Sequence, residues 1–537
     1  MKRNLLFLFL WCIPILYFAQ QEDAWVYLAD KQNVSASIAD PITILTQKAI
    51  DRKINHGVLI DERDVPVNEN YISLLKTQPG ISVLAKSKWL NAVHVRGTET
   101  NINALASLVF VSLIDFADKS LNTLKTEQVK KISKFQETFT TFNYGNALNQ
   151  IQMFKGDQLH LADYTGEGMT VAVLDAGFPN VNTMSSFQRL LGAGKILGHY
   201  DFVNRDENVY TNTESNHGTL VLSTMGGYVE NDYVGTAPDA SYYLFITEDG
   251  PNENPVEESF WVEAAERADS LGVDVINSSL GYGSFYDKTS YNYHPLDFDG
   301  QTTYITRGAN IAFEKGLLIV NSAGNEGLGG INAPADSAGV LSIGAVNSIG
   351  EYVTFSSVGS SIQPILKPDV VAQGLASVVI NESDGIGSAN GTSFSSPIMA
   401  GGIVCLWQAL PDKTNAEIMQ LVRESASQFN SPDYFLGYGI PNLQLALNNA
   451  LSMKDSEENN LDIKIFPNPL SNILNIAVPS NDNESKGIFY NILGKKVLEI
   501  DLDKNKSLLD LSFLSSGLYL LKIESQTFSQ TFKIVKN

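Results

Sequence analysis

The middle of the chain alternates short, continuous apolar runs with longer segments of helical spacing. The apolar runs cover residues 170–174, 242–246, 273–277, 317–320 and 340–343, and the helical patterns cover 217–225, 256–271 and 302–315. Runs of Val, Ile and Leu separated by helices are typical of a parallel sheet covered on both faces. The pattern therefore predicts an α/β domain over about residues 141–452, with functional groups at the carboxyl ends of its strands.

The segments on either side follow different patterns. Residues 21–140 predict a small α/β domain, with strands at 25–28 and 90–95, helices at 42–54 and 101–108, and a polar connector over 119–141. In this domain His94 is interpreted as an ordinary strand residue. After a helix at 443–451 and a charged linker at 453–461, six short apolar runs divided by turn residues predict a small β-sandwich over 462–537.

The first residues have the pattern of a secretory signal peptide. Lys2 and Arg3 precede an apolar run over residues 5–18, which is short for a membrane span and is followed by polar sequence. Removal of residues 1–20 would leave Cys405 as the single cysteine, within an apolar helix where an inert, buried thiol is expected. The chain is therefore expected outside the cytoplasm, without an internal disulfide.

Composition limits the kinds of partner. The formal net charge is −22 at pH 7, and 44% of the residues are hydrophobic. Nucleic acids and anionic membrane surfaces require clustered Lys and Arg, so neither is expected as a partner. The chain is expected to be globular and highly soluble.

Chemically useful side chains stand where strands end and where helices begin. Asp175 follows the first apolar run, His217 opens a helix, Asn325 lies in the glycine-containing segment after the fourth run, and Ser393 opens the uncharged helix at 394–410. A serine before a helix is often only an N-cap. Together, however, these residues could perform acyl transfer: a neutral imidazole takes the serine proton, a carboxylate holds the imidazole, and an amide stabilises the oxyanion.

The sequence around these residues resembles the subtilases, the subtilisin-like serine peptidases. Five blocks match in family order, at 171–177, 217–219, 277–281, 322–327 and 391–397. The resemblance implies a triad of Asp175, His217 and Ser393, with Asn325 and the backbone N–H of Ser393 at the oxyanion. Departures from the family pattern, such as Ala176 and Phe394, remove no catalytic group and affect expected substrate preference more than activity.

The resemblance also implies how substrate binds. Ser279, Leu280 and Gly281 would form an edge strand that pairs with an extended polypeptide, and Ser322, Ala323 and Gly324 would line the specificity pocket. A plain exit from a strand is the alternative for the first segment. The insertion at 282–300, with its tyrosines, is expected either to border the substrate cleft or to decorate a loop.

The expected partners and cofactors follow from the same likeness. Residues 21–140 resemble a subtilase propeptide in position and pattern, which implies an intramolecular inhibitor that is cleaved off between residues 118 and 144. No cofactor is expected to be required for catalysis. Asp297 and Asp299 leave a structural calcium ion open, but two carboxylates do not locate a site.

The last domain is similar to the C-terminal sorting domain of the type IX secretion system. The likeness rests on the segments at 466–469 and 516–519 and on the basic residues Lys533 and Lys536 near the end. It implies the type IX secretion machinery as a partner, and a secreted or outer-surface location. A carbohydrate-binding or packing module is the alternative.

The sequence as a whole therefore predicts a secreted serine endopeptidase acting on polypeptides. The main alternative is a catalytically silent surface protein that uses the subtilase scaffold for adhesion and presents the loop at 282–300. A preference for esters or lipids would use the same triad, but the blocks named above favour extended peptide.

Overall fold

A computed structural model of the chain describes residues 20–122, 142–211, 215–250, 252–457, 464–477, 485–491, 495–502, 507–524 and 529–536. Residues 1–19 of the predicted signal peptide and 123–141 of the predicted connector lie outside these ranges. The chain divides into two compact units, one up to Asn449 and one from Ala450. No helix in the described ranges is both long and apolar enough for a bilayer crossing.

A seven-stranded sheet forms the centre of the first unit. Its order is β13-β12-β11-β10-β5-β9-β6, and all neighbouring strands are parallel. The strands are β5 (Thr170–Asp175), β6 (Ile196–Asp201), β9 (Ser241–Ile246), β10 (Val275–Ser278), β11 (Leu318–Ser322), β12 (Val340–Val346) and β13 (Val370–Gln373). The predicted fold class is confirmed.

Two strands of this sheet were not predicted, for different reasons. β6 is a partly exposed edge strand whose Gly198 and His199 interrupt the apolar run. β13 has only four residues. Neither produces the long, continuous apolar signal that marks the buried strands of a parallel sheet.

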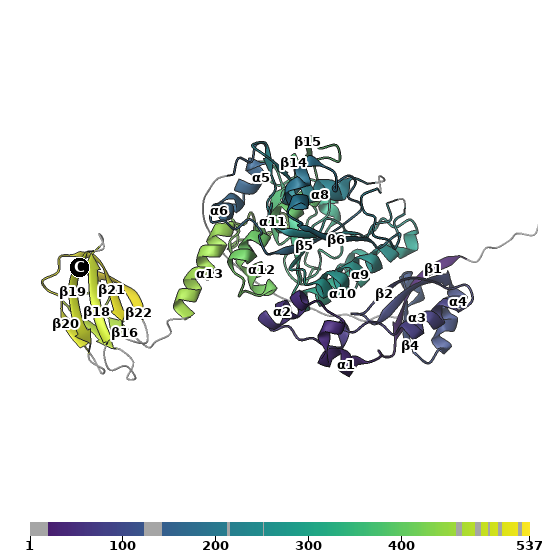
Figure 1. Ribbon diagram of the computed structural model, residues 1–537, viewed down its shortest axis with the longest axis horizontal. Coiled ribbons are helices and arrows are strands. Elements are labelled where there is room, and N and C mark those ends of the chain that lie inside the picture. Colours follow the sequence, from purple (N-terminus) through teal and green to yellow (C-terminus); the bar gives the residue numbers. More distant parts are fainter. Residues whose placement is uncertain are drawn as a thin grey trace, which may run out of the picture. The chain divides into compact units, whose positions relative to one another are not determined.

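Helices cover both faces of this sheet (Figure 1). α8 (His217–Gly226) and α11 (Thr392–Ala409) pack against each other on one face, and α9 (Val256–Leu271) and α10 (Tyr304–Glu314) lie on the other. α11 carries no charged residue and is buried along nearly its whole length. A Cβ atom at Gly401 would lie 2.0 Å from Oγ1 of Thr236, so this glycine allows α11 to pack closely.

Shorter elements complete the first unit. The other helices are α1 (Val34–Ala39), α2 (Gln47–Asn55), α3 (Glu69–Lys76), α4 (Glu99–Ala104), α5 (Leu148–Gln152), α6 (Gly156–Leu161), α7 (Gln188–Gly192) and α12 (Asn415–Glu424). A further helix, α13 (Leu443–Glu457), begins in the first unit and ends in the second. Two hairpins pair β7 (Tyr228–Val229) with β8 (Tyr233–Val234), and β14 (Ser377–Ile380) with β15 (Ile386–Ala389). α13 continues into the predicted linker, since Lys, Asp and Glu are compatible with a helix.

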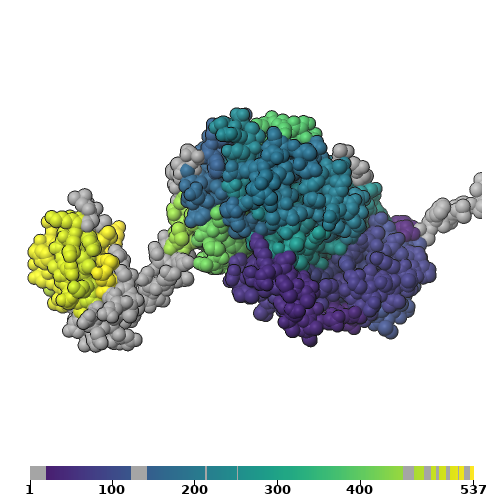
Figure 2. All heavy atoms as spheres, viewed as in Figure 1, coloured from purple at the N-terminus to yellow at the C-terminus, as the bar shows by residue number. Residues whose placement is uncertain are grey.

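The N-terminal domain is an antiparallel sheet with its own apolar core. Its order is β2-β3-β1-β4, with β1 (Gln21–Leu28), β2 (Ser82–Ser87), β3 (Ala92–Thr98) and β4 (Val111–Phe116). The sheet packs against α9 and α10, and Figure 2 shows its purple surface in close contact with the teal central part. Trp25 of β1 stacks on Tyr304 of α10 with ring centroids 4.5 Å apart.

Buried charges join the N-terminal domain to α9. Asp269 accepts hydrogen bonds from Arg52 at 2.5 Å and from Lys53 at 2.8 Å. Lys53 also pairs with Asp64, 3.2 Å away. A buried ion pair is costly to break because the remaining charge stays desolvated, so these contacts demand precise docking.

His94 lies in strand β3, as predicted, and it also belongs to this interface. Its Nδ1 lies 2.8 Å from Oγ of Ser259 on α9, and its Nε2 lies 2.9 Å from Oδ1 of Asp23. Trp25 donates its indole N–H to the same Ser259 oxygen at 2.8 Å. The apolar pattern of β3 predicted a strand. A local pattern could not show that the outer face of the sheet is covered by α9.

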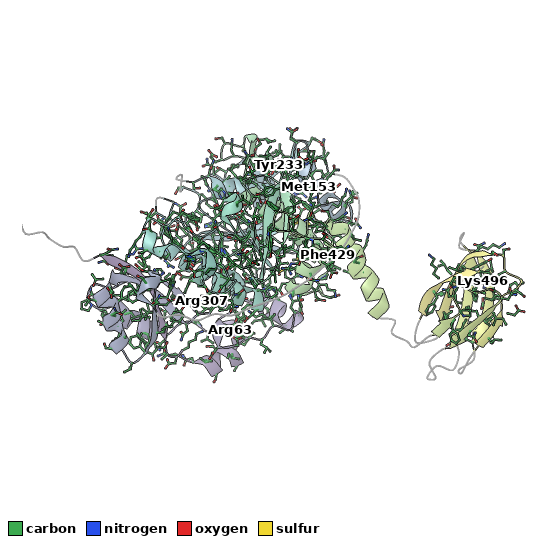
Figure 3. The ribbon with its side chains drawn as sticks, turned by 180° about the vertical axis from the view of Figure 1, so that it is seen from behind. Arg63, Met153, Tyr233, Arg307, Phe429 and Lys496 are labelled. Carbon is green, nitrogen blue, oxygen red and sulfur yellow. The ribbon has the colours of Figure 1, made fainter. Side chains whose placement is uncertain are left out.

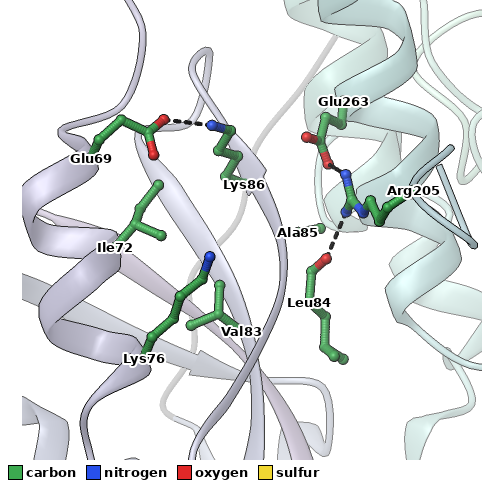
Figure 4. Close-up of a pocket in the computed structure, with 9 residues that line it drawn as sticks. All are labelled: Glu69, Ile72, Lys76, Val83, Leu84, Ala85, Lys86, Arg205 and Glu263. Carbon is green, nitrogen blue, oxygen red and sulfur yellow. Dashed lines mark hydrogen bonds and ion pairs between the residues drawn. The ribbon is translucent and has the colours of Figure 1, made fainter. Parts of the chain in front are cut away.

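More exposed contacts continue along the same boundary. Figure 3 labels Arg63, which pairs with Glu314 at 2.5 Å, and Arg307, which donates to Asp115 at 3.3 Å. Figure 4 shows a surface pocket between α3, β2 and the central domain, where Arg205 donates to Glu263 and to the carbonyl oxygen of Leu84. This pocket is part of the domain boundary.

The second unit is a small β-sandwich. One sheet contains β16 (Lys464–Phe466), β17 (Ile473–Ala477) and β20 (Ser507–Asp510), and the other contains β18 (Ser485–Asn491), β19 (Lys496–Leu502), β21 (Gly517–Glu524) and β22 (Ser529–Lys536). All neighbouring strands are antiparallel. Leu474, Phe489, Leu521 and Ile534 share one core between the sheets. β20 was not predicted.

Candidate active site

Asp175 and His217 meet at the carboxyl edge of the central sheet. Asp175 is the last residue of β5, and His217 is the first residue of α8. Oδ1 of Asp175 lies 2.7 Å from Nδ1 of His217 and also accepts the N–H of Ala176 at 2.8 Å. Asp175 is fully buried, and its Oδ2 has no hydrogen-bond partner within the described part of the chain. The carboxylate therefore directs one oxygen at the imidazole.

The surroundings of His217 favour its protonated form. Burial opposes the charged imidazole, but the charge and hydrogen bond of Asp175 and the charge of Glu248 outweigh burial and raise the pKa of His217 above 6.5. A carboxylate acceptor at Nδ1 places the proton of the neutral ring on that nitrogen. Nε2 is then left with a lone pair that can accept a proton.

Ser393 lies in the first turn of α11. Its Oγ donates to the carbonyl oxygen of Ser279 at 3.3 Å, and Oγ of Ser279 donates to the carbonyl oxygen of Ser393 at 2.8 Å. The ring of Phe394, the next residue, lies 5.8 Å from the ring of His217. The structure thus brings α8 and α11 together at this point, while the recorded hydrogen bond of the Ser393 hydroxyl goes to Ser279. Hydrogen bonds of catalytic groups often tighten only when substrate is bound.

Asn325 lies beside the start of α11. Its Oδ1 accepts the N–H of Thr392 at 2.9 Å and the hydroxyl of Thr392 at 3.0 Å. Because these donors require an oxygen acceptor, the orientation of the amide is defined, and Nδ2 is its donor end. A Cβ atom at Gly391 would lie only 3.6 Å from this Nδ2, so an amide donor stands close to the turn that precedes Ser393.

The predicted substrate segments leave neighbouring strands. Residues 279–281 follow β10, and residues 322–324 begin at the end of β11. Segment 279–281 is not paired with another strand in the described structure, but the carbonyl oxygens of Ser279 and Leu280 accept hydrogen bonds from the Ser393 hydroxyl and from the amide of Asn321. Gly324 adopts a φ of +111°, a conformation that favours glycine.

Glu248 is a site residue that sequence reasoning missed. It stands two residues after Ile246, the residue that pairs with Asp175 across β9 and β5, and Tyr282 donates its hydroxyl to it. Burial and the nearby charges of Glu253 and Asp175 raise the pKa of Glu248 to about 8. Glu248 follows the apolar run at 242–246 just as Asp175 follows the run at 170–174, so the same sequence signal could have found it.

The tyrosines of the insertion at 282–300 are buried. Tyr286 and Tyr293 donate to Glu258 of α9 at 2.8 Å each, and the hydroxyl of Tyr291 accepts the N–H of Asp23 at 3.0 Å. The insertion therefore packs on α9 and on the N-terminal domain. The four tyrosines of the insertion are therefore not exposed on the loop at 282–300 that the adhesion alternative would present.

The two carboxylates considered for calcium cap local turns. Asp297 accepts the N–H of His294 at 2.7 Å, and Asp299 accepts the N–H of Gln301 at 2.9 Å and of Thr302 at 2.8 Å. Within the described ranges, no group of three or more His, Cys, Asp or Glu side chains is placed to hold a metal ion. Cys405 is buried, and burial raises the pKa of its thiol well above 9.0, as expected for an inert thiol.

Three family models match the chain in succession. Residues 23–134 match the Peptidase S8 propeptide domain of Bacteroidota, residues 166–439 match the subtilase family, and residues 464–537 match a secretion system C-terminal sorting domain. The second match contains every residue named above for the triad, the oxyanion and the substrate segments.

Individual relatives agree with the family match. The chain is 28% identical over 347 residues to subtilisin NAT of Bacillus subtilis subsp. natto, which covers 62% of this chain and 81% of the relative. It is also 28% identical over 305 residues to a subtilisin of Bacillus pumilus, and this match covers 55% of this chain and 97% of that relative. A solved structure, MycP1 with the N-terminal propeptide removed, aligns at 23% identity and a TM-score of 0.43, covering 54% of this chain and 94% of that one.

Proposed function

The chain belongs to the subtilase family of serine endopeptidases, and we propose that it hydrolyses peptide bonds through Ser393, His217 and Asp175. In this mechanism His217 takes the proton of the Ser393 hydroxyl as its oxygen attacks the scissile carbonyl carbon. The tetrahedral intermediate collapses when His217 returns the proton to the leaving amine. Water, activated by the same imidazole, then releases the acyl group from Ser393.

The observation that carries this proposal is the 2.7 Å contact between Asp175 and His217. A buried carboxylate at Nδ1 holds one tautomer and stabilises the imidazolium that forms during attack. Since α8 and α11 pack together, His217 and Ser393 stand at neighbouring helix starts, and the ring of Phe394 lies 5.8 Å from that of His217. For the proposed reaction, the Ser393 hydroxyl must turn from the carbonyl oxygen of Ser279 to Nε2 of His217.

Asn325 supports the proposal on the oxyanion side. Thr392 occupies Oδ1 of Asn325, so Nδ2 is the group that can donate to a negative oxygen. The backbone N–H of Ser393, in the first turn of α11, supplies a second donor, and the start of the helix favours negative charge. Replacing Asn325 with Ala should lower turnover by about 10² to 10³ while leaving proteolytic specificity unchanged.

We also propose a maturation route. The N-terminal domain, residues 21–140, would act as an intramolecular inhibitor that is cut off between residues 118 and 144. The signal peptide at 1–20 would direct export, and the sorting domain would engage the type IX secretion machinery, giving a secreted or surface-attached enzyme. The family matches of the two flanking domains support this order of events.

The proposed reaction uses only side chains and backbone groups. We therefore propose that catalysis requires no metal or other cofactor. Hydrolysis that survives extensive treatment with a chelator would agree with this, and loss of turnover with retained fold would contradict it.

Ser393→Ala is the decisive variant. The full-length chain and the variant should be compared by intact mass and by hydrolysis of an unstructured protein such as casein. The wild type should lose its N-terminal domain and hydrolyse casein, and the variant should stay intact, with turnover reduced on the order of 10⁶-fold.

Ser395→Ala is a matched control on the same helix. Ser395 donates its hydroxyl to the carbonyl oxygen of Thr392 in the same helix, at 3.1 Å, so its loss should cost about 1 kcal/mol or less. Equal hydrolysis by Ser393→Ala and the wild type would refute the proposed nucleophile.

A further inference from the structure

A β-hairpin leads directly into the proposed nucleophile. β14 and β15 form this hairpin around a tip at 381–385, and residues 390–392 join the end of β15 to Ser393. β14 also packs on α8, where the hydroxyl oxygen of Ser223 accepts the N–H of Ile380 at 2.9 Å (Figure 1). The hairpin therefore connects the start of α11 with α8.

The tip of the hairpin is held in one shape by Asn381. Its Oδ1 accepts the N–H of Ser383 and the N–H of Gly385 at 3.0 Å each, and its own N–H donates to the carbonyl oxygen of Gly385 at 3.0 Å. A Cβ atom at Gly385 would lie 2.9 Å from Nδ2 of Asn381, so the turn has little room for a larger residue. These contacts fix the backbone from which Glu382 and Asp384 extend.

Glu382 reaches the residue before the proposed general base. Its Oε2 accepts the side-chain N–H of Asn216 at 2.6 Å, and its carbonyl oxygen accepts the side-chain N–H of Asn180 at 3.0 Å. Asn216 is the N-cap residue of α8, but its side chain makes no capping hydrogen bond to that helix. An asparagine at this position usually caps its own helix. Here its amide is directed to the hairpin instead.

Asp384 holds the loop that follows β5, the strand that ends at Asp175. Its Oδ2 accepts the N–H of Ser185 at 2.6 Å, and its Oδ1 accepts the N–H of Ser186 at 3.1 Å and the hydroxyl of Ser186 at 2.6 Å. Burial opposes the charge of Asp384, but the hydrogen bonds from these serines hold its pKa below the usual 3.8. Hydrogen bonds to an ionised acceptor are stronger than those between neutral groups.

Close packing joins the loop after β5 to the start of α8. A Cβ atom at Gly218 would lie 2.5 Å from the carbonyl oxygen of Gly177 and 3.0 Å from Cβ of Asp175. The hydroxyl of Thr219 donates to the carbonyl oxygen of Pro179 at 3.0 Å. A shift of either segment is therefore passed on to the other, and with it to the contact between the carboxylate and the imidazole.

We propose that Glu382 and Asp384 are positioning residues for the triad. The tip of the hairpin holds the loop after β5 and the start of α8 in place relative to the start of α11, and each of these three segments carries one member of the triad. This inference rests on the proposed function and assigns a role in it to residues that do not touch the reacting groups. A misplacement of about 1 Å caused far from the chemistry can cost on the order of 10² in rate.

The contact between Glu382 and Asn216 can be removed from either side. Glu382→Ala removes it from the hairpin, and Asn216→Ala removes it from α8. Each full-length chain is allowed to process itself, active enzyme is counted with a serine-directed covalent inhibitor, and kcat and KM are measured with labelled casein. Each variant should lower kcat on the order of 10- to 100-fold with KM nearly unchanged. The double variant should be no slower than the slower single variant, because both changes remove the same contact.

The pH profile gives a result that does not depend on how much of a variant has folded. Asp175 raises the pKa of His217 against the effect of burial, so a looser contact should lower this pKa. The acidic limb of the kcat/KM profile of Glu382→Ala should then move to lower pH, because the base must be neutral to act. Glu382→Gln keeps an acceptor oxygen for Asn216 and should retain the wild-type kcat and profile.

Asp384 is tested in the same assays. Asp384→Ala should lower kcat by a similar factor, and Ser186→Ala, which removes one of the three donors to Asp384, should lower it less. Ser383→Ala is the matched control, since Ser383 lies between the two carboxylates, is exposed, and has its side chain in none of the contacts above. It should behave like the wild type.

Wild-type kcat and an unshifted pH profile in Glu382→Ala and Asp384→Ala would overturn the proposal. Additive losses in the pair Glu382 and Asn216, or a loss confined to KM, would overturn it as well. If Glu382→Ala gives no active enzyme to count, Asn216→Ala decides alone, because it leaves the hairpin sequence intact. None of these results affects the proposed nucleophile, whereas a wild type that does not hydrolyse casein would refute the proposed function itself.

Discussion

Glu266 on α9 should make docking of the N-terminal domain depend on pH. Its carboxylate is 6% exposed and accepts hydrogen bonds from the hydroxyl of Ser87 at 2.6 Å and from the N–H groups of Lys88 and Trp89 at 2.9 Å each. Burial raises the pKa of Glu266 from 4.5 to about 7, although the charge of Lys88 and the hydrogen bonds oppose this. All three donors belong to the N-terminal domain.

The direction of the effect follows from linkage. With the domain docked, Glu266 holds its proton up to about pH 7, whereas an exposed glutamate releases it near pH 4.5. The stabilisation of the docked state is therefore complete below about pH 4.5 and is lost as the pH rises through 7. Since one pKa unit corresponds to about 1.4 kcal/mol, the full change is about 3 kcal/mol, or roughly two orders of magnitude in the docking equilibrium.

Glu266→Gln isolates this contribution. The amide has nearly the same shape and keeps one acceptor oxygen, but it does not titrate between pH 5 and 8. The Glu266→Gln variant should weaken docking of the N-terminal domain by the same amount at every pH, because the NH₂ group of the amide faces a hydrogen-bond donor. It should also reduce the pH dependence of this docking. Both chains should carry Ser393→Ala, so that the N-terminal domain stays attached.

The measurement is hydrogen exchange of backbone amides in β2 and β3 between pH 5 and 8, corrected for the intrinsic exchange rate. Protection should fall with rising pH in the parent chain and stay nearly constant in Glu266→Gln. Glu314→Gln serves as a control, since its side chain is 56% exposed at the same boundary and should leave the slope unchanged. If protection falls equally with pH in the parent chain and in Glu266→Gln, the proposed role of Glu266 in pH-dependent docking is refuted.

Three further results are expected. Asp175→Asn should lower kcat on the order of 10⁴-fold by releasing the imidazole tautomer, and an unchanged kcat would contradict the triad. The same variant should move the acidic limb of the pH profile of kcat/KM to lower pH, because Asp175 holds the pKa of His217 up and the base must be neutral to act. Gly401→Ala should lower stability by about 1–3 kcal/mol, measured by thermal unfolding of the Ser393→Ala chain, since its Cβ would overlap Thr236; equal stability would show that α11 can shift.

Much of the central domain follows from local pattern. Each of the five predicted strands overlaps an observed strand, and the predicted helix at 256–271 has the bounds of α9. These elements are long or continuously apolar, so periodicity alone identifies them. The position of Asp175 at a strand end and of His217 and Ser393 at helix starts was also readable, because strand ends and helix starts are local features.

Which residues become neighbours in the site depended on how the strands and helices pack. Asp175 and His217 are neighbours because β5 and α8 meet at one sheet edge, and the structure brings Asn325 to the start of α11 in the same way. His94 and the tyrosines of the insertion show the limit of sequence reasoning. Their burial depends on a covering surface that is distant in the sequence, so no local pattern reports it.

By itself, then, the sequence determined the parallel sheet, its helices and the positions of the residues proposed to perform acyl transfer, since each of these is encoded within a short segment. Only the tertiary structure decided that Glu266 and Asp269 on α9 are covered by the N-terminal domain. The physical reason is that burial, the pKa shifts it causes and the depth of a pocket are properties of surfaces in contact, which form only when distant segments pack together.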